Sequence, residues 1–145
     1  MAIIQIALEY KMKKDIISKL NSLGFIDGTN LQNHSIVNNE TTFWQHVLEN
    51  AQAAKNNSYI VYEINPQKEN FFGDGEGVVA ELSCSLNLYT INSPESKDTY
   101  DLRTLIEEEF SSGFWKIEFN LFEYDKDSRL NHYSYTISSI YGSDD

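Results

Sequence analysis

The clearest feature of the chain is an alternation of apolar and polar residues with a period of two. From residue 78 to residue 88 every second side chain is apolar, and the intervening ones are mainly polar. Because successive side chains of a strand point to opposite faces, this pattern predicts a strand with one apolar face. Residues 114–124 and 130–141 alternate in the same manner. Residues 58–65 are rich in β-branched and aromatic side chains and end before Pro66, which indicates a fourth strand.

Two segments in the first half of the chain have helical spacing instead. The first predicted helix covers much of residues 5–23 and ends before Gly24, a residue that suits a left-handed cap. The second covers residues 42–55 and opens with a Thr and a Gln spaced as in a capping box. Residues 25–40, between these two, are rich in Asn, contain one Gly and predict a long surface loop.

A third helix is predicted to begin at Asp98 or Thr99 and to end before Gly113. Since one face of each strand is polar, we expect an α+β fold, with a mostly antiparallel four-stranded sheet and helices packed on one face. The chain is predicted to form a single domain over residues 1–145, with a polar tail at 142–145. The side chains expected inside the sheet are Leu82, Cys84, Leu86, Ile117, Phe119 and Tyr135.

Composition narrows the classes of function. Apolar residues make up 41% of the chain and aromatic residues 13%, which favours a folded protein over a disordered one. The net charge of −11 disfavours specific binding to nucleic acid and to anionic membrane surfaces. The single cysteine excludes an internal disulfide, and no apolar run approaches the roughly 20 residues of a membrane span. A soluble protein of a reducing cytoplasm is therefore expected.

The glycine-rich stretch FFGDGEG, residues 71–77, resembles a ligand-binding loop at first sight. A calcium loop requires several oxygen ligands and a closing Glu, whereas this stretch supplies only Asp74 and Glu76 before the strand begins. A phosphate-binding loop precedes a helix, and this one precedes a strand. We therefore predict a hairpin turn with a solvated acidic tip, and no metal or cofactor.

No catalytic site is predicted either. The three histidines, His34, His46 and His132, fall on a predicted loop, a helix and the solvated face of a strand. Cys84 alternates with leucines and is expected to be a small buried side chain rather than a nucleophile. The carboxylates of residues 107–109 are expected on the wet side of the third helix.

Two adjacent aromatic residues, Phe71 and Phe72, lead into the acidic tip. They cannot both face one side of a strand. One interpretation is that a phenylalanine anchors the hairpin loop, residues 65–77, to the protein's own core. The other is a contact with a partner, and the candidate assembly-interface loop then comprises Phe71, Phe72, Asp74 and Glu76.

At residues 58–141 the order of elements resembles that of the tail terminator, or tail-completion, proteins of long-tailed bacteriophages. The stretches that carry the resemblance are YIVYEINP as a first strand, AELSCSLNLYTIN after a long hairpin, DLRTLIEEEF as a helix and FEYDKDSRLNHYSYTISSIY at the end. The predicted helix at 42–55 and the long loop at 25–40 depart from the family's common pattern.

The resemblance implies a structural function without catalysis. Such proteins form a homo-oligomeric ring of about six copies that caps the tail tube protein, stops its polymerisation and presents a surface to a neck or head-completion protein. The expected location is the head-proximal end of the virion tail, after assembly in the host cytoplasm. An acidic ring suits a channel through which DNA passes, since like charges repel. The alternatives are another neck or head-completion adaptor, an acidic inhibitor or immunity protein that binds a basic partner, and a small-ligand binder or enzyme.

Overall fold

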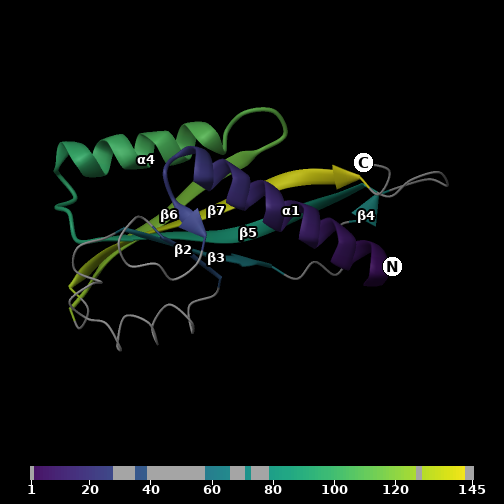
Figure 1. Ribbon diagram of the computed structural model, residues 1–145, viewed down its shortest axis with the longest axis horizontal. Coiled ribbons are helices and arrows are strands. Elements are labelled where there is room, and N and C mark those ends of the chain that lie inside the picture. The colour runs from purple at the N-terminus through teal and green to yellow at the C-terminus, as the bar shows by residue number, and fades with distance from the viewer. Residues whose placement is uncertain are drawn as a thin grey trace.

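The structure of the protein is a computed structural model that describes residues 2–27, 35–38, 58–65, 71–72, 79–126 and 129–142. Its fold is α+β (Figure 1). Four long strands form an antiparallel sheet in the order β3 (Tyr59–Ile64), β5 (Val79–Thr90), β7 (Leu130–Gly142) and β6 (Lys116–Asp125). Helices α1 (Ala2–Ser22) and α4 (Lys97–Glu109) pack on one face of this sheet, as predicted.

Three short strands extend the four-stranded sheet. β1 (Ile26–Asp27) and β2 (Ser35–Asn38) add to β3 in parallel, and β4 (Phe71–Phe72) pairs with the start of β5. The prediction of a loop over 25–40 was therefore wrong at both strands. Ile36 is completely buried in the common core, so tertiary burial stabilises a strand that the local composition does not predict.

The core lies between the two helices and the sheet. Three side chains of β5 point into the core, namely Leu82, Cys84 and Leu86. Tyr135 of β7 lies opposite Leu86. All four side chains are fully buried, which confirms their predicted positions. From α1 the core receives one side chain per turn, namely Leu8, Met12, Ile16 and Leu20. From α4 it receives Ile106 and Phe110.

Strand β6 departs from the predicted burial. Ile117 packs against the core only in part, and Phe119 is 42% exposed, so the prediction of a buried Phe119 was wrong. The reason is position: β6 is the last strand of the sheet order, and a bulge between Phe119 and Leu121 shifts its register. A side chain at a sheet edge lacks the second neighbouring strand that would cover it.

The helix boundaries differ slightly from the predicted ones. α4 begins one residue before Asp98, because the hydroxyl of Ser96 caps it by accepting the backbone N–H of Thr99 at 3.2 Å. The helix ends at Glu109, and Gly113 lies in the following turn with a φ of 65°. The predicted second helix, residues 42–55, lies outside the described residues.

Candidate functional site: assembly surfaces

The described part of the segment that leads into β5 pairs with the sheet. Phe71 lies opposite Ala80 and Phe72 opposite Val79, so the predicted interface loop contains the short strand β4. Val79 in turn lies opposite Gly142, the last residue of β7. Figure 1 shows β4, the C-terminal end of β7 and the N-terminal end of α1 at the same end of the molecule. Asp74 and Glu76 lie outside the described residues.

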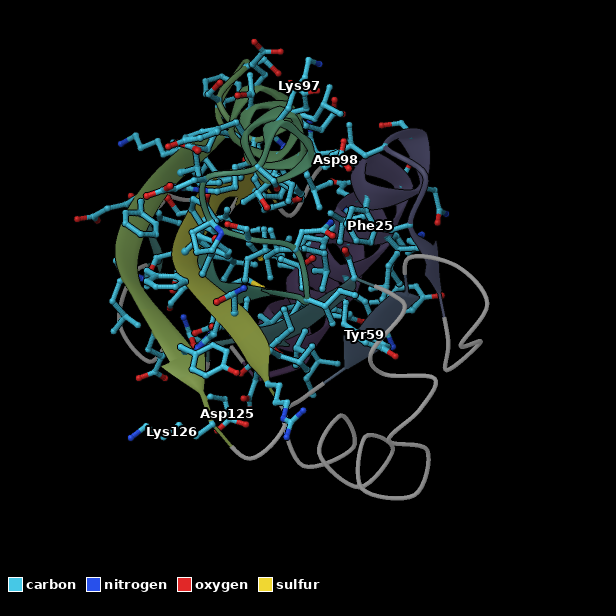
Figure 2. The ribbon with its side chains drawn as sticks, turned by 90° about the vertical axis from the view of Figure 1, so that its left-hand side faces the viewer. Phe25, Tyr59, Lys97, Asp98, Asp125 and Lys126 are labelled. Atoms are coloured by element: carbon cyan, nitrogen blue, oxygen red, sulfur yellow. The ribbon has the colours of Figure 1, made fainter. Side chains whose placement is uncertain are left out.

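A second exposed surface follows the edge strand β6. Four of its ten residues are large hydrophobic side chains with 42–51% exposure, namely Phe119, Leu121, Phe122 and Tyr124. Figure 2 shows β6 along the outer margin of the sheet, with Asp125 and Lys126 at its end. A long edge strand with exposed apolar side chains is typical of a surface that other chains contact.

Arg103 of α4 lies over aromatic rings of β6 and β7. Its guanidinium carbon is 4.7 Å from the ring centre of Phe119 and 4.9 Å from that of Tyr133. Its Nε donates to the hydroxyl of Tyr135 at 2.9 Å, and that hydroxyl donates to Glu107 at 3.2 Å. Burial raises the pKa of Tyr135 to about 12, against the opposing effect of Arg103. These contacts fix α4 against β6 and β7 and hold the aromatic rings in place.

The alternation of residues 114–124 did not predict this surface. The signal was present, because Leu121 and Phe122 are adjacent apolar residues that break the alternation of the strand. Such a break indicates a bulge or an edge strand with apolar side chains on both faces. The pairing with β7 shows that the bulge is the cause.

His132 occupies a buried polar network rather than the solvated face that the alternation predicted. Its ring stacks on Tyr89 with centroids 4.3 Å apart, and only 8% of the residue is exposed. Nε2 lies 2.7 Å from the Asn87 side-chain oxygen, and Nδ1 lies 3.3 Å from a carboxylate oxygen of Glu123. The polar face of the sheet is therefore covered at this end, and the imidazole has a structural role. His34 and His46 lie outside the described residues.

Cys84 is a structural residue. It is completely buried, and desolvation by burial raises the pKa of its thiol to about 12. A thiol with so high a pKa provides almost no thiolate at neutral pH and so makes a poor nucleophile.

Two carboxylates of α4 contact neighbouring elements. Glu107 accepts the hydroxyl of Tyr135, and Glu109 pairs with Lys19 of α1 at 3.8 Å. Glu108 points to solvent. Among the described residues, no three His, Cys, Asp or Glu side chains approach closely enough to hold a metal ion. None of the described helices is long and apolar enough to cross a membrane.

In comparisons with known proteins, the chain matches no family model and no curated protein. The function must therefore be argued from the surfaces themselves.

Proposed function

We propose that the protein is a structural phage tail terminator, which forms a ring at the end of the tail tube, stops tube polymerisation and presents the surface that joins the neck. Such a function requires contact surfaces of defined shape rather than a reactive centre. The resemblance of residues 58–141 to the tail terminator family suggests this function.

The observation that carries the proposal is the exposed edge strand β6. It offers four exposed large apolar side chains, next to an arginine that lies over two aromatic rings. Aromatic side chains and arginine are enriched where proteins bind one another. The hairpin with β4 lies on the opposite flank of the sheet, beside β5. Two different flanks can meet head to tail, and contacts of that type close into a ring when the rotation between copies allows it.

The net charge of −11 agrees with the proposal without requiring it. A ring through which double-stranded DNA passes benefits from a negative field, because the phosphate backbone is then repelled from the channel wall.

A double substitution in the hairpin tests the proposal. We expect Phe71→Ser with Phe72→Ser to leave the chain folded but to abolish capping, so that an infection complemented with the variant produces tails of uncontrolled length. The measurement is the distribution of tail lengths by electron microscopy. As a matched control, Ile91→Ser with Leu105→Ser removes two apolar side chains that are 42% and 45% exposed elsewhere.

The outcomes separate the parts of the proposal. Tails of normal length with the hairpin variant would exclude the hairpin from capping. A parent protein that stays monomeric and never joins purified tails would exclude the terminator function.

A further inference from the structure

A groove lies beside the last residues of β7. Strand β6 begins opposite Ser138, so β7 continues beyond it through Ser139, Ile140 and Tyr141. These three residues pair with β5 on one side and lie next to no strand of the described residues on the other. Residues of this strand, Trp115 and three residues of α1 enclose a groove of about 310 Å³.

The rim of the groove carries positive charge. Helix α1 bears four lysines against two carboxylates, in a chain with a net charge of −11. Two of these lysines, Lys11 and Lys14, line the groove. Lys14 lies 4.8 Å above the ring of Tyr10 and forms no ion pair with a described carboxylate. Lys11 reaches the carbonyl of Gly142 at 3.5 Å, which places its ammonium group at the end of the strand.

Among the described residues that line the groove, the one carboxylate is already engaged. Asp15 accepts the hydroxyl of Tyr141 at 2.7 Å, and burial, together with this hydrogen bond, raises the pKa of Tyr141. The wall is fixed by aromatic packing: Trp115 meets Tyr141 edge to face at 6.3 Å and Phe110 at 5.3 Å. A preformed groove with a cationic rim and an open strand flank fits an extended acidic segment.

The same chain carries an acidic segment that directly follows β4 in the sequence. The stretch GDGEG, residues 73–77, follows β4, and β4 pairs with the two residues of β5 nearest the end of β7. β4 lies on the β3 side of β5, whereas the groove lies on the β6 side of β7. β4 and the groove thus lie on opposite flanks at one end of the sheet. In a ring with cyclic symmetry, equivalent points of all copies lie at the same position along the ring axis. Two surfaces at the same end of the sheet can therefore meet between neighbouring copies.

We propose that the groove of one copy binds the acidic hairpin tip of the next copy, with Lys11 and Lys14 facing Asp74 and Glu76 of the neighbour. The inference rests on the proposed ring and names its lateral contact. The neighbour's hairpin would then run alongside Ser139, Ile140 and Tyr141, in line with β6.

Charge reversal on each side tests the contact. A groove variant, Lys11→Glu with Lys14→Glu, faces its neighbours' acidic tips with acidic side chains. A tip variant, Asp74→Lys with Glu76→Lys, faces its neighbours' basic grooves with basic side chains. We expect each variant alone to need at least about tenfold more protein to assemble, because like charges at an interface repel. Assembly is measured by sedimentation velocity and by capping of purified tails.

Mixing the two variants is the decisive step. In a ring that alternates the two, every basic tip meets an acidic groove and every acidic tip meets a basic groove. We expect a 1:1 mixture to assemble within about threefold of the parent's concentration. A contact within one chain cannot be restored by mixing. Lys97→Glu with Lys126→Glu is the control, since it changes net charge equally at exposed sites outside the groove.

Each result decides something. Variants that assemble and cap like the parent would overturn the lateral contact and leave the proposed ring standing. Variants that fail both alone and in the mixture would also overturn it. A parent that neither assembles nor joins tails would overturn the proposed function and the contact with it.

Discussion

At the scale of single residues, the buried side chains of types that can take part in catalysis pack within the protein instead. Cys84 lies among apolar residues of the core, and His132 is held by stacking on Tyr89 and by contacts with Asn87 and Glu123. A side chain held in this way stabilises one arrangement of the strands around it. Its substitution is therefore expected to change stability rather than a reaction.

The register of β5 provides the most severe test at this scale. Leu86→Asp places an unpaired charge at a fully buried position and is expected to cost several kcal/mol of unfolding free energy, on the order of 4. Leu121→Asp, at a position 46% exposed on β6, is the matched control and should remain close to the parent. Chemical denaturation measures both. Equal stability of the two variants would contradict the assignment of inner and outer faces.

Cys84 also predicts a dependence of stability on alkaline pH. Its thiol pKa rises from 9.0 in the unfolded reference to about 12 in the folded protein. Between these values the unfolded chain releases the proton first and binds fewer protons than the folded chain, so unfolding becomes easier as pH rises. The stabilisation is fully present below pH 9 and is lost progressively above it.

Cys84→Ala removes this contribution. We expect its unfolding free energy to fall less steeply than the parent's between pH 9 and pH 10.5, by up to about 1.4 kcal/mol per pH unit. Tyr135, whose pKa is also raised, begins to contribute above its ordinary value of 10.0 in both proteins. Urea denaturation at a series of pH values measures the slopes. Identical slopes would show that the thiol is not desolvated.

At the scale of elements, α4 is anchored at its start, middle and end. Ser96 caps its first turn, Arg103 joins it to β6 and β7 in the middle, and Glu109 meets α1 at its end. The helix thereby supports the exposed edge of the sheet, which has no further strand of the described residues to hold it.

The cap of α4 can be tested by one substitution. Ser96→Ala removes the acceptor for the Thr99 N–H and should lower the unfolding free energy by about 1 kcal/mol. Ser111→Ala, which removes a hydroxyl contact with the Glu108 carbonyl in an exposed turn, is the control and should cost less. Thermal unfolding of both variants supplies the measurement. A larger loss from Ser111→Ala would mean that the helix is not anchored at its first turn.

At the scale of the whole molecule, the two flanks of the sheet differ in chemistry. One flank presents the aromatic edge of β6 and the basic groove beside β7, and the other carries the hairpin with β4. This difference favours a head-to-tail assembly over a two-fold pairing of identical surfaces.

The acidic hairpin tip is predicted to act through charge at an interface and not through a bound metal. Asp74→Asn with Glu76→Gln should therefore leave the melting temperature unchanged in excess calcium and in chelator, since a turn depends on its glycines. Scanning calorimetry with both additives gives the comparison. A calcium-dependent rise in melting temperature that the parent shows and the variant loses would establish a metal site.

The alternation of apolar and polar residues predicted burial correctly in the strands whose apolar face lies against the core. The strict period of two in β5 predicted its inner face, and the sheet with helices on one side followed from four such strands. The residues Phe71 and Phe72 were placed in a loop before β5, and their pairing with Ala80 and Val79 was not predicted, because two residues are too short a run to show a strand pattern.

By itself the sequence determined the fold class, the inner face of β5, the buried Cys84 and the acidic charge of the chain, because these depend on residue type and short-range period. The tertiary structure alone decided which strand became the edge, and therefore that Phe119 is exposed while His132 is buried. It also brought Lys11 and Lys14 beside the end of β7, more than a hundred residues away along the chain. Such neighbours arise from strand order and helix docking, which no local pattern encodes.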